Sequence, residues 1–174
     1  MSNYIREYSP DKVSVTWGGK MPMSGFADGT FISMSRNSAR TDVTVGAQGD
    51  SGITRSADYT GLVEITLLQN SPTNQYLTYL MSVEDTTDEL IRANMEVIDP
   101  SGAVLAIASR CHLQTPADIV LGDGQNAKTW TFFSEHLRYL TLPNGLLDSE
   151  AVQNAAQVYG AIKTVSDNLK TITS

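Results

Sequence analysis

The sequence is short of positive charge, and this shortage excludes one broad class of function. It contains 12 Lys and Arg against 19 Asp and Glu, which gives a net charge of −7 and a pI near 4.7. Proteins that bind nucleic acid tightly neutralise phosphates with a basic patch, and no stretch of this chain carries one. We therefore do not expect tight binding to DNA or RNA.

Cysteine and long hydrophobic runs are also scarce. Cys111 is the only cysteine in 174 residues, so an internal disulfide is impossible and a reducing cytoplasm suits the chain. The first residues, MSNYIREYSPDK, lack the apolar stretch and the cleavage site of a secretory signal. The longest apolar run is too short to cross a bilayer, so no membrane partner is predicted.

Residues suited to catalysis or metal binding are few as well. Cys111 and His112 are adjacent, and neighbouring side chains on a strand point to opposite faces, so His112 cannot act as a base for Cys111. His136 is the other candidate base, but a lone cysteine on a strand is typically an inert small hydrophobe. No metal-ligand spacing is found among the carboxylates of Asp118, Asp123 and Glu135. We predict no catalytic residue, no metal and no cofactor.

What the sequence does have is a series of segments with the two-residue period of strands. In KVSVTWGG, the apolar residues Val13, Val15 and Trp17 alternate with polar ones. MEVIDPSGAVLAI reads as a hairpin that reverses at Asp99 to Gly102. TWTFFSEHLRYL is predicted to be one strand, with Trp130 and Phe132 on one face and Phe133 on the other.

Two segments have helical spacing instead. Ser71 as N-cap and Pro72 at the first helical position open a helix that we expect to lie against the sheet as a plug. Its apolar face comprises Tyr76, Leu77, Leu80, Met81 and Val83. A second helix is predicted over residues 148 to 171, with an extended C-terminal arm as the alternative. Strands, a helix, more strands and a tail together indicate an α+β, mainly β fold: a β-sandwich or partial barrel with a flanking helix.

The segment from Phe26 to Asn70 is more polar than a core requires. We expect TFISMSR and DVTVG to form a long hairpin around the polar turn Asn37 to Thr41, followed by the half-buried strand LVEITLL. An isolated pair of strands is marginally stable in water, so another molecule must cover this hairpin. We therefore expect one domain over residues 1–174: a core at 10–140, an arm at 29–56, and a C-terminal extension at 146–174. Residues 60–68 belong to the core sheet.

The run GTFISMSRNSARTDVTVGAQGDSGITRSADYTGLVEITLLQNSPTNQYLT, the turn DPSGAVL and the strand TWTFFSEHL together resemble the inner tail tube proteins of contractile-tailed bacteriophages. The tubes of R-type bacteriocins and type VI secretion systems are related to this family. The resemblance covers about residues 10–140 and is most specific from Gly29 to Leu77. There, Gly49-Asp50, Thr54-Arg55-Ser56 and Gly61 punctuate the strands.

The resemblance implies a structural role without enzymatic activity. Six copies would form a ring whose inner strands join into one continuous barrel, and stacked rings would form a hollow tube that conducts DNA during ejection. The implied partners are other copies of the chain, the tail sheath, the baseplate and the tail terminator, in a virion tail assembled in the host cytoplasm. The arm would reach the neighbouring ring through Ser35, Arg36, Asn37, Ser38, Arg40, Thr41, Asp42 and Arg55.

The acidic balance would also have a purpose in such a tube. A ring of six chains, each with a net charge of −7, would repel DNA phosphates and let DNA slide through the channel. The candidate lumen-facing residues are polar ones opposite the apolar faces: Ser14, Thr16, Thr44, Glu64 and Thr66.

Three alternatives remain open from the sequence. The first is a tube subunit of a related contractile injection device. A second is a small β-barrel ligand-binding module with Trp17, Trp130 and Tyr139 as a stacking surface. The third is a hydrolase that uses Cys111, His136 and a carboxylate.

Overall fold

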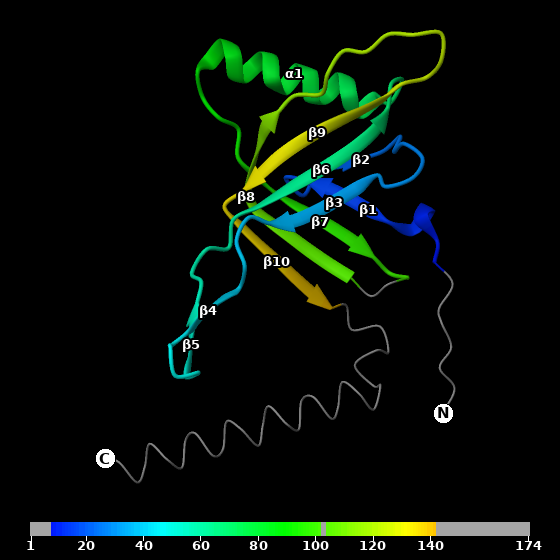
Figure 1. The fold of residues 1–174 in the computed structure, drawn as a ribbon. Coiled ribbons are helices and arrows are strands. Elements are labelled where there is room, and N and C mark those ends of the chain that lie inside the picture. The colour runs from blue at the N-terminus through cyan, green and yellow to red at the C-terminus, as the bar shows by residue number, and fades with distance from the viewer. Residues whose placement is uncertain (1–7, 102–103, 142–174) are drawn as a thin grey trace.

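Eight strands form a single antiparallel sheet, and two more form a separate hairpin (Figure 1). The computed structural model describes residues 8–101 and 104–141. The strand order in the large sheet is β2-β1-β7-β8-β9-β6-β3, and β10 also pairs with β8. The elements are η1 (Pro10–Lys12), β1 (Ser14–Trp17), β2 (Met21–Met23), β3 (Ile32–Arg36), β4 (Thr41–Val45), β5 (Ser51–Arg55), β6 (Gly61–Leu68), α1 (Pro72–Thr87), β7 (Ala93–Asp99), β8 (Val104–Thr115), β9 (Ala127–Ser134) and β10 (His136–Thr141). The fold is α+β and mainly β, as the periodicity predicts.

The long strand β8 is shared by two halves of the sheet. Its first part pairs with β7 and β10, and its last part pairs with β9. The first half-sheet is therefore β2-β1-β7-β8-β10, and the second half-sheet is β8-β9-β6-β3. A β-bulge in β8 separates them: Ala93 lies opposite Cys111 while Met95 lies opposite Ala108, so β8 has one extra residue there. Arg110, inside this bulge, has a φ of 50°.

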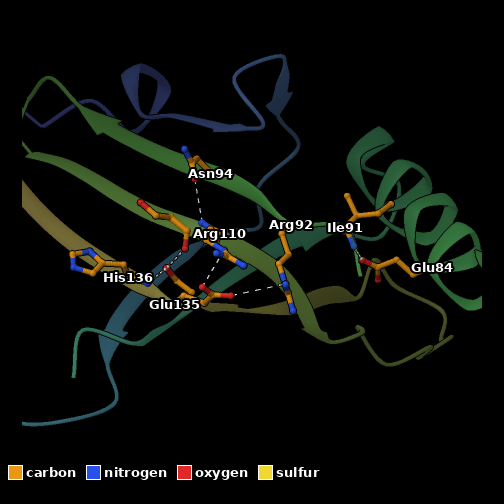
Figure 2. Close-up of polar contacts among 9 residues, drawn as sticks. Glu84, Ile91, Arg92, Asn94, Arg110, Glu135 and His136 are labelled. Atoms are coloured by element: carbon orange, nitrogen blue, oxygen red, sulfur yellow. Dashed lines mark hydrogen bonds and ion pairs between the residues drawn. The ribbon is translucent and has the colours of Figure 1, made fainter. Parts of the chain in front are cut away.

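The segment TWTFFSEHLRYL is interrupted at the same level. It forms β9 and β10 with Glu135 between them, rather than the single strand expected from its composition. Figure 2 shows Glu135 between two arginines: its Oε2 lies 3.0 Å from Nε of Arg110, and its Oε1 lies 3.9 Å from Nε of Arg92. The backbone N–H of Arg110 donates to Oδ1 of Asn94 at 3.1 Å. These contacts hold the bend where one half-sheet passes into the other.

The core lies between the two half-sheets. The alternating residues Val15 and Trp17 of β1 point inward, as expected, and so do Trp130 and Phe132 of β9. Trp17 meets Phe132 edge to face with 5.6 Å between ring centroids, which joins the two half-sheets directly.

Strand β6 is a central strand of the core sheet, although it lies in the segment from Phe26 to Asn70 that is poor in apolar residues. It pairs with β9 on one side and β3 on the other, and Val63, Ile65 and Leu67 are completely buried. The period-two prediction for LVEITLL is confirmed, but the sequence underestimates how much of the core this strand provides.

Helix α1 covers one end of the sandwich, as predicted (Figure 1). Ser71 is the N-cap and accepts a hydrogen bond from the backbone N–H of Thr73, with Pro72 at the first helical position. Leu77 is buried in the core, and Oδ1 of Asn74 accepts a 2.8 Å hydrogen bond from Nε1 of Trp130. Tyr76, which the helical spacing places on the apolar face, is instead 45% exposed.

The expected long hairpin between TFISMSR and DVTVG is wrong. Strand β3 pairs with β6, so that Ile32 and Met34 add to the apolar face opposite Ile65 and Val63. Strand β4 pairs with β5, and this hairpin turns at residues 46–50, not at 37–41. The physical reason is burial, because pairing with β6 places Ile32 and Met34 beside the buried residues Ile65 and Val63, whereas the valines of β4 are exposed and offer no buried face. The predicted helix at 148–171 lies outside the described residues.

Candidate assembly surface

The arm is not residues 29–56 as expected from the sequence, because β3 belongs to the large sheet. From here on we define the arm as residues 37–58, which project away from the sandwich (Figure 1). Every residue of β4 and β5 is exposed, and the two strands pair only with each other. Val43 lies directly opposite Ile53, and Val45 follows on the same face. The side chains of Val43, Ile53 and Val45 are 55%, 72% and 64% exposed, respectively. One face of the arm is therefore an apolar stripe that the described residues leave open to water.

The opposite face of the arm is polar. It carries Asp42, Thr44 and Thr54, with Asp42 paired to Thr54 across the hairpin. Arg55 lies opposite Thr41 and belongs to the same face as the apolar stripe. The arm is thus amphipathic, with a cation at the base of its apolar side.

Hydrogen bonds join the two ends of the arm where it leaves the sandwich, at residues 37–38 and 58–60, which we call the root of the arm. The backbone N–H of Asn37 donates to the carbonyl oxygen of Thr60 at 3.1 Å. Asp58 accepts a hydrogen bond from the hydroxyl of Ser38 and another, at 2.8 Å, from the backbone N–H of Thr60. These bonds, led by that of Ser38, lower the pKa of Asp58. The root is therefore held together by hydrogen bonds within the subunit, although the apolar stripe beyond it is exposed to water.

A cluster of arginine and tyrosine side chains lies beside this root. Nη2 of Arg36 donates to the carbonyl oxygen of Leu137 at 3.0 Å, and its guanidinium lies 4.9 Å from the ring centroid of Tyr59 and 5.8 Å from that of Tyr139. The hydroxyl of Tyr139 donates to the carbonyl oxygen of Met34 at 3.0 Å. These contacts close the edge of β10 against β3 and bring distant parts of the sequence to the root.

The structure brings the predicted arm residues together. Ser35 and Arg36 end β3, and the other six lie on the arm itself: Asn37, Ser38, Arg40, Thr41, Asp42 and Arg55. Sequence reasoning did not place Tyr59, Tyr139 and Arg138 beside the arm, although all three adjoin this surface; it named Tyr139 only as part of a ligand-stacking surface. Tyr59 follows the polar hinge directly, but no local signal connects Tyr139 and Arg138 to residues about a hundred positions earlier.

The predicted lumen residues do not share one surface of the subunit. Ser14 and Thr16 lie on the outward face of β1 in the first half-sheet, and Thr44 lies on the arm. Glu64 and Thr66 lie on the outward face of β6 in the second half-sheet, which points away from the core on the other side. The outward positions of β3, β6 and β9 around them carry small hydroxyl groups and one carboxylate, with large apolar side chains toward the strand ends: Ser33, Ser35, Glu64, Thr66, Thr129 and Thr131, then Leu62, Leu68 and Phe133.

The structure argues against the two rival sites considered from the sequence. Cys111 is fully buried, and burial raises the pKa of its thiol to about 12, so no thiolate nucleophile is available near neutral pH. His136 stacks on Tyr59 beside the arm, with 4.7 Å between ring centroids. The expected stacking surface is not formed either, because Trp17 and Trp130 are core residues on separate half-sheets.

Metal sites and membrane spans are both absent from the described part of the chain. Residues 8–101 and 104–141 contain no group of three or more His, Cys, Asp or Glu side chains that could hold a metal ion. In the same ranges, no helix is both long and apolar enough to span a membrane.

No protein-family model and no curated protein sequence matches the chain. Several solved structures share its fold. The cap that terminates the tube of the anti-feeding prophage is 10% identical, with 81% of this chain and 94% of that chain aligned at a TM-score of 0.54. The sheath/tube terminator of PVC, an extracellular contractile injection system, is 8% identical, with 78% and 97% aligned at a TM-score of 0.55. A chain of the PVC sheath-tube complex is 8% identical, with 78% and 93% aligned at a TM-score of 0.51. The chain therefore has the fold of components of contractile injection systems, over nearly the whole length of those components.

Proposed function

We propose that this protein is a structural subunit of a contractile tail or injection device, in which copies of the chain form rings that stack into a tube. The observation that carries this proposal is the arm. A two-stranded hairpin with an open apolar stripe is marginal in water on its own, and it becomes stable when a neighbouring molecule covers it. The shared fold with tube and terminator components supports the same role.

In this proposal six copies close into a ring, and the arm of each copy contacts the next ring. A contractile sheath surrounds the tube, with a baseplate and a terminator at its ends, and in a phage tail the channel conducts DNA. A single ring-wide barrel also removes the free strand edges of each subunit. The protein then resides in the tail of the virion or device after assembly in the cytoplasm.

We assign the channel wall to the outward face of the second half-sheet. Small hydroxyl groups and the carboxylate of Glu64 make the middle of this face weakly acidic, which suits sliding phosphates, and the apolar pair Leu62 and Phe133 lies at one end of it. The outward face of the first half-sheet is a poorer wall because of its cation, Arg138; its other outward side chains are mixed, with Ser14, Thr16 and Glu96 beside Ile98, Leu105 and Ile107.

Electron microscopy of the purified full chain tests the proposed function. Negative-stain images at increasing protein concentration are expected to show rings and hollow tubes. A monomer that persists at high concentration, confirmed by light scattering, would contradict the proposal.

The same images separate a second candidate, a tube terminator, which the two similar terminator structures favour. A terminator closes a tube, so its rings should not stack further when the protein is concentrated. Tubes of many rings identify a tube subunit, and single rings identify a terminator.

Labelling of single cysteine variants tests the channel wall. Cys111 is buried, so a cysteine introduced at Glu64 or Ser14 is the reactive thiol on the folded protein. A maleimide carried on a large polymer should label Glu64→Cys in the free subunit but not in the tube, because the polymer does not enter the channel. Ser14→Cys should be labelled in both states, and equal protection of the two sites would contradict the assignment.

A further inference from the structure

The root of the arm has an excess of positive charge on an otherwise acidic chain. Four of the 12 Lys and Arg gather there: Arg36, Arg40, Arg55 and Arg138. Arg36, Arg40 and Arg55 line an open cavity of about 440 Å³ together with Tyr59 and Tyr139. We call this surface the arginine cluster.

Within the described residues, no carboxylate neutralises the arginine cluster. The ion pairs in that part of the chain are the two of Glu135, with Arg92 and Arg110. Asp58 is close in sequence, but its carboxylate accepts from Ser38 and Thr60 rather than from an arginine. Nη2 of Arg55 makes a long, 3.5 Å hydrogen bond to the hydroxyl of Tyr59, which leaves its charge unpaired. The guanidinium groups of Arg40 and Arg55 are therefore available to carboxylates of another molecule.

A second surface has the opposite character. The C-terminal end of α1 and the residues after it carry Glu84, Asp85, Asp88 and Glu89. These four side chains line a groove of about 470 Å³, whose other walls are Met81, Leu90, Leu113, Gln114 and Pro116. We call this surface the acidic groove.

Few positive groups within the subunit offset the negative charge of the acidic groove. The last turn of α1 has no basic residue, and the C-terminus of a helix carries partial negative charge of its own. Glu84 accepts a 2.7 Å hydrogen bond from the backbone N–H of Ile91, as Figure 2 shows. Asp85 and Glu89 are exposed and take part in neither ion pair of the described residues. A cationic partner would relieve this accumulation of negative charge.

The two surfaces are separate and share no lining residue. In Figure 1 α1 is at the top of the sandwich, whereas the arm leaves the left side at about mid-height and points downward. Within the subunit the arm points away from α1, and no ion pair of the described residues joins the arginine cluster to the acidic groove. Two different surfaces that complement each other between identical chains form a head-to-tail contact, which repeats from copy to copy.

We propose that the arginine cluster of one copy binds the acidic groove of the next copy along the assembly. This inference rests on the proposed function and names the surfaces through which the copies are joined. Arginine suits this contact because its planar guanidinium binds carboxylates in a bidentate manner. The apolar stripe, which shares a face with Arg55, then covers the apolar wall of the groove at Met81, Leu90 and Leu113.

A charge-swap experiment on the full chain tests the contact. The first variant carries Arg40→Glu and Arg55→Glu, the second carries Asp85→Lys and Glu89→Lys, and the third combines all four changes. Arg36 and Glu84 are left unchanged, because each makes a short hydrogen bond with the backbone of the subunit, at 3.0 Å and 2.7 Å, whereas Arg55 makes only a 3.5 Å bond to the side chain of Tyr59. Light scattering and electron microscopy measure the lowest protein concentration at which assembly occurs.

Each charge-reversed pair should raise this concentration by about tenfold or more, since like charges then face each other. The combined variant should return it to within about threefold of the wild-type value, because the attraction is restored with the signs exchanged. Control pairs with the same charge change elsewhere, Lys12→Glu with Lys20→Glu and Asp118→Lys with Asp123→Lys, should leave assembly nearly unchanged.

The outcomes separate this inference from the proposed function. If the wild-type chain assembles and the combined variant is not restored while circular dichroism shows that it is folded, the inference is overturned and the tube proposal stands. Assembly that is insensitive to both charge-reversed pairs also overturns the inference and leaves the tube proposal standing. If the wild-type chain forms no rings or tubes, both proposals fail.

Discussion

Arg110 and Glu135 form an ion pair, with 3.0 Å between Nε and Oε2, at the two points where neighbouring strands break. Arg110 is the positive-φ residue of the bulge in β8, and Glu135 is the residue between β9 and β10. The pair therefore holds the bend that converts one antiparallel sheet into two facing layers (Figure 2). Both side chains are more than a third exposed, so their attraction is screened by water.

Substitutions at Arg110 should separate backbone strain from the ion pair. Alanine loses the ion pair but keeps the strained φ, at a cost of about 0.5 kcal/mol. Glycine loses the same ion pair but relieves about 1 kcal/mol of strain. We therefore expect Arg110→Gly to be more stable than Arg110→Ala by about 1 kcal/mol in urea unfolding. Equal stabilities would contradict a strained bulge.

Gly61 should not tolerate any side chain. A Cβ at this position would lie 2.7 Å from Cδ2 of Leu137 and 2.7 Å from the carbonyl oxygen of Ser35. One neighbour is backbone and the other is fully buried, so neither can move freely. Gly61→Ala should lower the free energy of unfolding by about 1–3 kcal/mol. Gly52→Ala is the matched control, because the nearest atom to its Cβ would be the carbonyl oxygen of Thr44 at 4.0 Å, an ordinary contact, and its effect should stay within about 0.5 kcal/mol.

The root of the arm should loosen in acid. Hydrogen bonds from Ser38 and Thr60 lower the pKa of Asp58 below its ordinary value of 3.8. A depressed pKa in the folded state gives stability that is fully present above the unfolded pKa and is lost as the pH falls through the folded pKa. Hydrogen exchange at the amide of Thr60, which donates to Asp58, should therefore accelerate below about pH 3.8.

Ser38→Ala is the matched variant for this prediction. It removes the largest cause of the shift, so the acceleration should begin at a higher pH than in the wild-type protein. The same pH profile for both proteins would show that Asp58 does not control the root.

Cys111 should resist alkylation in the folded protein. The thiol is fully buried and its pKa is raised to about 12 by that burial, so both access and thiolate formation are suppressed. Iodoacetamide at about pH 8 should leave it unmodified for hours and label it fully in urea, as mass spectrometry can measure. Rapid modification without denaturant would reopen the hydrolase alternative.

The apolar stripe should matter for assembly and not for folding of the subunit. Val43 and Ile53 are exposed, so Val43→Ser with Ile53→Ser should change the free energy of unfolding by about 0.5 kcal/mol or less. Assembly should then require about tenfold more protein, because the interface loses apolar burial. Thr44→Ala with Thr54→Ala, on the polar face of the arm, should have a smaller effect. A larger effect of the threonine pair would place the contact on the other face.

Local chemistry was sufficient to predict much of the fold. Val15, Trp17, Trp130 and Phe132 alternate with polar neighbours, and all four are buried where the alternation places them. Ser71 and Pro72 predict the start of α1 because capping depends on adjacent residues. The fold class follows from the order of such elements, each readable over a short window.

Pairing partners could not be predicted in the same way. TFISMSR is equally compatible with β4 and with β6, and only the buried face formed by Ile65 and Val63 selects β6. The break between β9 and β10 at Glu135 could not be predicted from the sequence either, because it depends on Arg110 in another strand. Long-range burial and ion pairing between residues far apart in the chain decide these features, so no local pattern encodes them.

The residues of the candidate surface were likewise predictable only in part. Arm residues such as Arg40 and Arg55 could be named from the polar segment that contains them, whereas Tyr139 and Arg138 join them only through the pairing of β10 with β8. The acidic groove likewise needs the end of α1 beside the end of β8. Periodicity and capping act between near neighbours and are written in the sequence, while the charge of a surface depends on which distant segments the core brings together.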